Sequence, residues 1–237
     1  DPPPPPPLPP PPPLPRSRSG RQAAAMAASA ASSAGSPDAS GMTLYHCEQA
    51  RSFRVLWTLH ELGVKGYRLV TMPFPPRFAA EGYTKVNVLG TIPYLVDGET
   101  RMTESCGIPM YLVEKFGPTS LQVKPNEPDF GAYLNWITHA DATLTFPQTV
   151  FLRFVMQEAK KGLGEAGVAY AKWFIARLRL VDQTLSDGRE FLCAGRFTAA
   201  DVCVAYALQL GVSLGLDKAH GPYKPQTMAY LERMRAR

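Results

Sequence analysis

The sequence lacks any run of about 18 consecutive apolar residues, the length that a membrane-spanning helix requires. Its 4 cysteines form no Cys-x-x-Cys pair and no His/Cys grouping at the spacing of zinc ligands. Neither sign of charge dominates, because a formal net charge of +5 is spread over 237 residues. These absences predict a soluble protein with reduced cysteines, no membrane span, no metal and no nucleic-acid partner.

The amino end has the most biased composition of the chain. Residues 1–41 combine proline runs with a mixture of Arg, Ser, Ala and Gly. Such a segment cannot bury enough apolar area to offset its ordering entropy, so we predict a disordered tail. Other interpretations stay open: an SH3 or WW ligand in the proline run, an organelle transit peptide in residues 16–41, or an untrimmed translation whose true start is Met26 or Met42.

Residues 42–118 show the pattern of a small α/β domain. Strands are predicted over residues 43–46, 67–71, 94–96 and 100–102, and helices over residues 51–62 and 105–116. Gly63 is the C-cap of the first helix, and Asp97 with Gly98 supplies the positive φ values of a two-residue hairpin turn. A strand, a helix and a strand in succession imply a parallel pair with a right-handed crossover. The order is therefore β-α-β-β-β-α, a thioredoxin-like arrangement.

Pro93 stands immediately before the third predicted strand, where a missing N–H is tolerated. The Ile92–Pro93 bond is open to either isomer, and a cis form would turn the N–H and C=O of Ile92 outward, toward a bound extended peptide. Glu104 and Ser105 precede the next apolar run, so they are predicted to open a helix whose free amides attract a carboxylate. Together these features favour a small acidic peptide as the ligand.

This stretch resembles the glutathione-binding half of the glutathione S-transferase superfamily, which carries Leu-Gly-x-[Val/Ile]-Pro-x-Leu, a hairpin and then Glu-Ser at a helix start. The matching residues are Leu89, Gly90, Ile92, Pro93, Leu95, Glu104 and Ser105. The resemblance implies glutathione as co-substrate, with Glu104 on its α-ammonium and Ser105 on the neighbouring carboxylate. Ile92 and Pro93 would border the peptide, and Arg51 is the preferred cation for a glutathione carboxylate because its fork binds bidentately.

Transferase chemistry on glutathione requires the thiolate, because the thiol is a poor nucleophile. The resemblance directs the search to the turn after the first strand, where Gln49 or Ala50 replaces the usual catalytic Ser or Cys. Ser52 is the first candidate for activating the thiol and Tyr45 is the second. Cys47 lies within reach of the same turn and could instead form a mixed disulfide with glutathione.

The second half of the chain has helical stripes and no strand signals. Residues 119–128 are predicted as a linker and residues 129–237 as an all-helical bundle, so the fold class is α/β plus all-α. One helix is expected over residues 165–185. The helical pattern continues to the last residue of the sequence, so we expect a truncation there.

Two features of this helical region bear on folding or substrate binding. Thr198 and Asp201 form the pattern of a capping box at the start of a helix that runs to residue 210. Tyr133 and Trp136 are candidates for the second-substrate pocket, because they lie near where the first long helix of such proteins faces the glutathione domain.

The sequence thus predicts a glutathione S-transferase-like enzyme that joins the glutathione thiolate to a small electrophilic, largely apolar molecule. The resemblance implies a cytoplasmic homodimer that acts in detoxification, with an organelle location open if residues 1–41 are a transit peptide. Two alternatives remain. One is a glutathione-dependent thiol/disulfide or dehydroascorbate reductase that uses Cys47, and the other is a non-catalytic glutathione-fold binding module.

Overall fold

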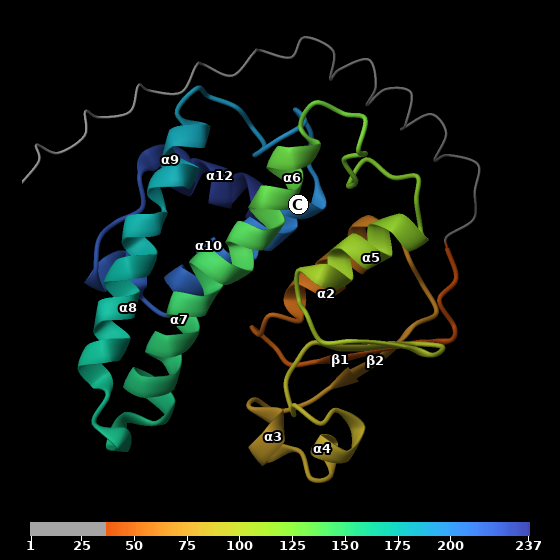
Figure 1. Cartoon of the computed structure of the whole chain (residues 1–237), viewed down its shortest axis with the longest axis horizontal. Helices are drawn as coiled ribbons and strands as arrows, with labels where there is room; N and C mark the ends of the chain where they lie inside the picture. Colours follow the sequence, from red (N-terminus) through yellow and green to blue (C-terminus); the bar gives the residue numbers. More distant parts are fainter. Residues whose placement is uncertain (1–36) are drawn as a thin grey trace, which may run out of the picture.

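The computed structural model describes residues 37–237 (Figure 1). Most of the tail predicted over residues 1–41 lies outside them. The last few tail residues are tied to the first domain, since Lys65 N–H donates to Pro37 O over 3.0 Å and Ala39 N–H donates to Lys65 O over 2.9 Å. The first domain therefore begins before Met42, earlier than predicted.

A four-stranded sheet forms the centre of the first domain, in the order β2-β1-β3-β4. Its strands are β1 (Met42–His46), β2 (Arg68–Thr71), β3 (Tyr94–Asp97) and β4 (Thr100–Met102). β1 and β2 are parallel, whereas β3 is antiparallel to β1 and to β4. The two-residue turn of the β3–β4 hairpin is Gly98 and Glu99, with Gly98 at a φ of 56°. The prediction that Asp97 shares the positive φ values is wrong, because Asp97 still belongs to β3 and pairs with Thr100. The thioredoxin-like prediction is confirmed by this topology.

Helices cover both faces of the sheet (Figure 1). They are α2 (Phe53–Glu61) and α5 (Gly107–Lys115) on one face, and α3 (Pro76–Ala79) and α4 (Tyr83–Val86) on the other. Side chains alternate along each strand. Leu44 and Leu95 therefore join the core under α2 and α5, while Tyr45 and Tyr94 lie on the opposite face.

The second domain is helical and stands beside the face of the sheet that α2 and α5 cover (Figure 1). Its elements are α6 (Phe130–Thr138), η1 (His139–Thr145), α7 (Phe146–Phe151), η2 (Leu152–Gln157), η3 (Ala159–Lys161), α8 (Gly164–Arg177), α9 (Arg179–Leu185), α10 (Ala199–Ser213), α11 (Leu216–Ala219) and α12 (Pro225–Arg235). The central helix, α10, packs against α6, η1, α11 and α12 and also against α2 of the first domain.

Two helix predictions in this domain had different outcomes. The single helix expected over residues 165–185 is wrong, because α8 and α9 meet at a turn at Leu178. The capping box is confirmed: Thr198 is the N-cap of α10, and its N–H donates to Asp201 Oδ2 over 2.9 Å. α10 then runs three residues beyond the predicted end at residue 210.

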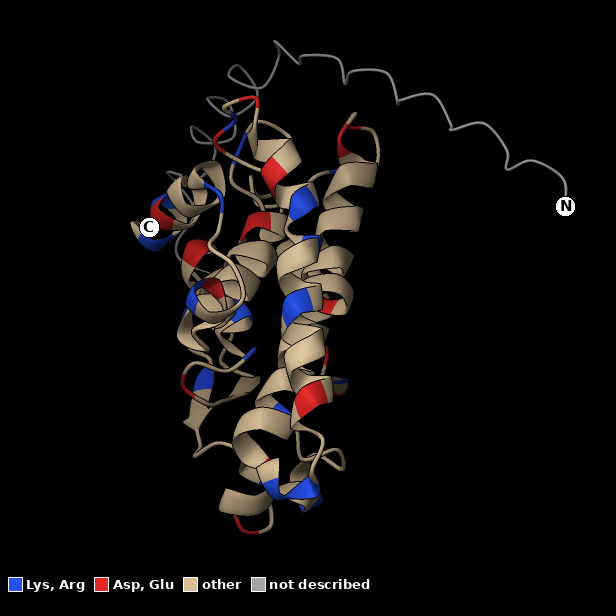
Figure 2. Cartoon of the chain, turned by 90° about the vertical axis from the view of Figure 1, so that its left-hand side faces the viewer, with Lys and Arg blue, Asp and Glu red and all other residues tan. Residues whose placement is uncertain are grey.

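Figure 2 shows basic and acidic residues mixed along the helical domain, in keeping with the modest net charge of the chain. Across residues 37–237, every helix is too short or too polar to cross a lipid bilayer.

Candidate functional site

Ser52, the first candidate for activating a thiol, lies in the turn between β1 and α2. Its side chain is fully buried, and its Oγ shares a hydrogen bond of 2.8 Å with His46 Nδ1. The same Oγ accepts the Cys47 N–H over 3.2 Å. Burial lowers the pKa of His46, which favours the neutral form of the ring beside this hydroxyl. The Ser52 side chain thus braces the turn from inside and is not presented to a ligand.

The main-chain amides of this turn are oriented differently. Phe53 N–H donates to Ala50 O over 2.9 Å and Arg54 N–H donates to Arg51 O over 3.2 Å, which begins α2. The N–H groups of Arg51 and Ser52 have no hydrogen-bond partner within residues 37–237. Two free amides at the positive end of a helix dipole favour a negative charge there.

The helical domain holds the same turn in place. Gln49 has a φ of 58°, in the left-handed region that few residues other than glycine adopt. The Tyr206 hydroxyl of α10 donates to Gln49 O over 3.1 Å. Ala50 follows directly and carries no donor in its side chain. Chemistry at this turn therefore relies on main-chain groups or on neighbouring residues.

Tyr45, the second candidate, lies with Ala50 and Ile92 around one small apolar cluster. Its ring centre is 5.7 Å from that of Tyr83 and 5.8 Å from that of Tyr94. In the described part of the chain the Tyr45 hydroxyl makes no hydrogen bond. The structure thus brings a hydroxyl with an unused donor near Ala50 and Ile92.

The Ile92–Pro93 peptide bond is cis. The sequence had left its isomer open. Thr91 O accepts hydrogen bonds of 2.8 Å from both the Tyr83 hydroxyl and Asn87 Nδ2, which anchors the loop before β3. The main-chain N–H and C=O of Ile92 have no partner among the described residues. This unpaired stretch can receive an extended peptide as an added strand.

Ser105 and Glu104 lie just before α5, as predicted, but their environments differ. Glu104 is exposed, and the Thr103 hydroxyl donates to its Oε1 over 3.1 Å. Ser105 is 3% exposed, and its Oγ accepts a hydrogen bond of 2.8 Å from Arg54 Nη1. Because the Ser105 oxygen is an acceptor in that bond, its own O–H can still donate to a ligand.

Arg54 joins this site to the helical domain. The guanidinium is fully buried, and all five N–H donors of an arginine have partners. These are Ser105 Oγ at 2.8 Å, Asp141 Oδ1 at 3.1 Å, Thr145 Oγ1 at 2.7 Å and the carbonyls of Ala140 and Cys203 at 3.2 Å each. The planar fork therefore fixes the start of α5 against η1 and α10.

Arg51 is the accessible cation of the site. Its side chain is 37% exposed, and its Nη1 lies 3.9 Å from Asp141 Oδ1, at the edge of ion-pair range. Asp141 is shared with the buried Arg54. A guanidinium held this loosely is available for a carboxylate ligand.

Cys47 has an environment that opposes thiolate chemistry. The side chain is fully buried, and its Sγ lies 3.5 Å from Pro73 O, to which it donates. Burial raises the pKa of the Cys47 thiol to about 11. A reactive cysteine requires a lowered pKa and exposure, so Cys47 lacks both properties.

Tyr133 and Trp136, predicted for the second-substrate pocket, are 3% and 4% exposed in the core of the helical domain. Neither ring lines an open cavity, because both point into the packing between helices. They were suggested by their place on the first long helix, and the structure packs both into the core of the helical domain. A groove of about 520 Å³ lies elsewhere among the described residues, between α2, α10 and α12.

The sequence did not identify Arg54 as part of the site. It also did not show that α2 packs both against α5 of its own domain and against α10 of the helical domain. A signal existed for Arg54, since it interrupts an otherwise apolar helix face next to Val55. Its partners are 51 to 149 positions away, so no local pattern could name them. Among residues 37–237 no group of three His, Cys, Asp or Glu side chains is placed to hold a metal ion.

Comparison with known sequences gives one family. The family model for the glutathione S-transferase N-terminal domain matches residues 40–114. Glutathione S-transferase 3 of Schizosaccharomyces pombe is 29% identical over 180 residues, which cover 68% of this chain and 70% of that protein. Glutathione S-transferase theta-2 of Mus musculus is 31% identical over 172 residues, 66% of this chain and 65% of that protein. The chain thus spans about two thirds of these relatives.

Solved structures agree on the fold. A glutathione transferase from Methylococcus capsulatus aligns with a TM-score of 0.66 at 24% identity, over 83% of this chain and 93% of that chain. Ure2p in complex with glutathione aligns with a TM-score of 0.70 at 21% identity, over 83% of this chain and 95% of that chain. At these identities the likeness concerns the fold alone.

Proposed function

Because the chain belongs to the glutathione S-transferase superfamily, we propose that it is an enzyme that joins the glutathione thiolate to a small, largely apolar electrophile. The observation that carries the proposal is the unpaired main chain of Ile92 beside the Arg54-anchored Ser105. The main chain of an extended acidic peptide can form hydrogen bonds with the main chain of Ile92. A carboxylate of the same peptide can accept a hydrogen bond from the Ser105 hydroxyl.

In this proposal the two ends of glutathione have separate partners. The Ser105 hydroxyl binds the carboxylate of the γ-glutamyl end, and the exposed Glu104 binds its ammonium group. Arg51 binds the other carboxylate, since its guanidinium is only loosely paired. Pro93 borders the peptide without competing for its hydrogen bonds, because proline has no N–H.

The thiolate lies at the start of α2 in this arrangement. Lowering a thiol pKa by two units requires about 2.7 kcal/mol of preferential stabilisation of the anion. The free amides of Arg51 and Ser52 and the Tyr45 hydroxyl are the donors at hand, together with the helix dipole. Ser52 thus acts through its main chain, and its buried side chain supports the turn.

An assay with three variants tests these roles. We expect Tyr45→Phe to lower kcat for conjugation of glutathione to 1-chloro-2,4-dinitrobenzene by about 10- to 100-fold, because one donor to the thiolate is lost. Ser52→Ala should keep kcat within about threefold of wild type yet lower the unfolding free energy by about 1–3 kcal/mol, since the Cys47 N–H loses its acceptor. If Ser52→Ala keeps wild-type stability but loses activity, the Ser52 hydroxyl has a catalytic role and the main-chain role proposed for Ser52 is wrong.

The same assay separates the alternatives. A Cys47-dependent reductase predicts hydroxyethyl disulfide reduction that disappears in Cys47→Ser, a result that the burial of this thiol disfavours. A non-catalytic module predicts retention on immobilised glutathione without turnover in either assay. The homodimer, the role in detoxification and the cytoplasmic location belong to the proposal through family resemblance alone.

A further inference from the structure

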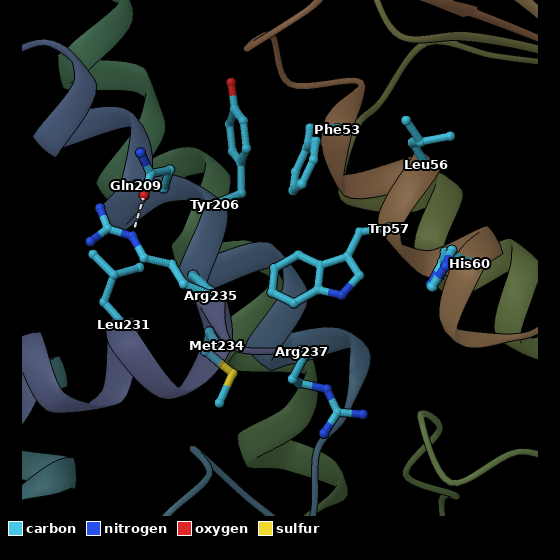
Figure 3. A pocket seen from close by; sticks show the side chains of 11 residues that line it. Phe53, Leu56, Trp57, His60, Tyr206, Gln209, Leu231, Met234, Arg235 and Arg237 are labelled. Carbon is cyan, nitrogen blue, oxygen red and sulfur yellow. Dashed lines mark hydrogen bonds between the residues drawn. The ribbon is translucent and has the colours of Figure 1, made fainter.

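Tyr206 of α10 reaches from the helical domain to the turn before α2. Its hydroxyl donates to Gln49 O over 3.1 Å. Figure 3 shows the side chain beside Phe53, with the hydroxyl directed away from Trp57. The side chain is 5% exposed, and Gln49 O already accepts the one hydrogen of the hydroxyl. Any effect of Tyr206 on a bound ligand therefore passes through the turn.

The ring of Tyr206 is held by α2 itself. The Arg54 guanidinium carbon lies 4.8 Å from the ring centre, and the Phe53 ring stacks near it with centres 6.5 Å apart. Arg54 is in turn fixed by its hydrogen bonds to both domains. The docking of the two domains therefore sets the position of the Tyr206 hydroxyl.

Gln49 is the residue that this hydroxyl supports. Ala50 N–H donates to Cys47 O over 3.3 Å, which closes a four-residue turn with Gln49 in its third position. A positive φ at this position favours glycine or asparagine, because the Cβ of most L residues crowds the main chain in the left-handed region. Gln49 has a φ of 58°. The bond from Tyr206 therefore stabilises a conformation that glutamine alone disfavours.

Ala194 shows the same arrangement elsewhere in the fold. Between residues 37 and 237 it is the other non-glycine residue with a positive φ, at 55°. It is also held by a side chain that is distant in sequence, since its N–H donates to Asp129 Oδ2 over 2.6 Å. In both places a bond from another part of the fold supports the left-handed residue.

The amides that follow Gln49 are those to which we assign the chemistry. The N–H groups of Arg51 and Ser52 come two and three residues later and have no hydrogen-bond partner within residues 37–237. Free amides at a helix start stabilise an anion only when they point at it. If Gln49 leaves the left-handed region, the main chain that enters α2 changes direction and the two amides change direction with it.

We propose that Tyr206 is a positioning residue for the thiolate: its hydroxyl holds Gln49 in the left-handed conformation, which keeps the amides of Arg51 and Ser52 aimed at the sulfur of bound glutathione. The inference rests on the proposed function. It makes the helical domain a determinant of how strongly the first domain stabilises the thiolate.

Titratable and charged groups from both domains surround the turn. They are Tyr45, His46, Cys47, Glu48, Arg51 and Arg54 of the first domain and Asp141 and Tyr206 of the helical domain, with Cys106 and Cys203 beside Arg54. Burial raises the pKa of Tyr206 to about 12, so its hydroxyl keeps its hydrogen near neutral pH. Tyr206→Phe thus removes the bond to Gln49 without changing any charge. A changed thiol pKa in this variant reports the geometry of the turn.

The test measures the pKa of the glutathione thiol in its complex with the protein. Ultraviolet absorbance of the thiolate gives this pKa, and so does the pH profile of kcat/KM with 1-chloro-2,4-dinitrobenzene. We expect Tyr206→Phe to raise the thiol pKa by about 0.5–1 unit. The value of kcat/KM should then fall by about three- to eightfold at pH 6 and by less than about twofold at pH 9.

Tyr223→Phe is the matched control. It removes a second buried tyrosine hydroxyl of the helical domain, one that donates to the main-chain Leu208 O over 3.0 Å. Leu208 and Tyr223 lie outside the turn, so the thiol pKa should equal that of wild type. An equal rise in Tyr206→Phe and Tyr223→Phe would assign the effect to a general loss of packing and overturn the role of Tyr206.

A rescue experiment separates positioning from a direct effect. Glycine adopts the left-handed region readily, so Gln49→Gly removes the need for the bond from Tyr206. In the Gln49→Gly background, Tyr206→Phe should shift the thiol pKa by less than half as much as it does in wild type. An equal shift in both backgrounds would contradict positioning through Gln49.

The outcomes also distinguish this proposal from the function on which it rests. If wild type lowers the thiol pKa of glutathione and Tyr206→Phe lowers it equally, the role of Tyr206 is overturned and the transferase function stands. If wild type binds glutathione without lowering its thiol pKa, the transferase function is contradicted, and the role of Tyr206 with it.

Discussion

Asp201 shows how a single buried carboxylate can organise a helical domain. The side chain is fully buried and accepts four hydrogen bonds of about 3 Å. The donors are the N–H groups of Leu192 and Thr198 and the hydroxyls of Thr198 and Tyr230. Burial is nonetheless the largest influence, and it raises the pKa of Asp201 from 3.8 to about 6. The sequence predicted the contact with Thr198. The other two partners, Leu192 and Tyr230, lie outside the capping-box motif.

This raised pKa gives a definite pH dependence. A carboxyl group with a folded pKa above its unfolded pKa binds more protons in the folded state, so its contribution to stability is fully present below pH 3.8 and is lost as the pH rises through 6. The unfolding free energy of wild type relative to Asp201→Asn should therefore fall by about 2 kcal/mol between pH 4 and pH 7. Urea titrations at both pH values measure this, and a difference that is flat or rises with pH would refute it. Glutathione affinity should be the same in both proteins.

Ser52 marks the limit of sequence reasoning at a single residue. Its position at the start of a helix could be predicted from the apolar spacing that follows. The direction of its side chain could not, because His46 and Cys47 bind its Oγ only once β1 and the turn have folded. Ile92, Glu104 and Ser105 were easier to predict, since a strand start and a helix start specify the geometry of their own main chain.

Helices and strands could be predicted from the sequence where a local turn or capping motif determines their ends. Gly98 marked the hairpin, although the turn lies one residue later than predicted, at Gly98 and Glu99. The Thr198–Asp201 pair marked the start of α10. The turn at Leu178 had no such sign, because neither glycine nor proline separates α8 from α9. Tertiary packing decides that break, since Leu178 is 3% exposed in the helical core.

Close packing of α10 gives a prediction that opposes helix propensity. Gly211 lies inside α10, where an added Cβ would overlap the Tyr223 hydroxyl and come within 2.8 Å of the Phe174 ring. Gly211→Ala should therefore lower the unfolding free energy by about 1–3 kcal/mol, although alanine favours a helix by about 1 kcal/mol.

The matched control for this substitution is Gly131 in α6, where a Cβ meets nothing within 4 Å. Gly131→Ala should raise the unfolding free energy by up to about 1 kcal/mol. Thermal or urea unfolding of both variants decides the matter. Equal stabilisation by both substitutions would show that α10 packs less closely than described.

Arg54 couples the two domains of the molecule. Its five donors reach α5, η1 and α10, and its guanidinium carbon lies 4.8 Å above the Tyr206 ring. Such a network could not be predicted, because its members are brought together only by the docking of the domains. The division into an α/β and a helical part was predictable, since the period of the apolar pattern changes along the chain.

Removing this guanidinium should therefore weaken the whole fold. We expect Arg54→Met to lower the unfolding free energy by about 3–5 kcal/mol, because Asp141, Thr145 and Ser105 lose a buried partner. Arg51→Met removes a loosely paired cation near the same carboxylate and should cost about 1 kcal/mol or less. The unfolding free energy of Arg54→Lys should be close to that of Arg54→Met, since an ammonium group cannot donate to all five acceptors of the guanidinium. Wild-type stability of Arg54→Met would contradict this role.

The central claim is that glutathione lies along the edge between the α2 turn, Ile92 and the start of α5. A glutathione titration followed by amide nitrogen–proton correlation spectra tests it directly. We predict saturable shifts of the amide signals of Arg51, Ser52, Ile92 and Ser105, with the amide of Gly131 unmoved as a remote reference. Saturable shifts confined to other parts of the chain, or no saturable shift at all, would contradict the assignment of this site.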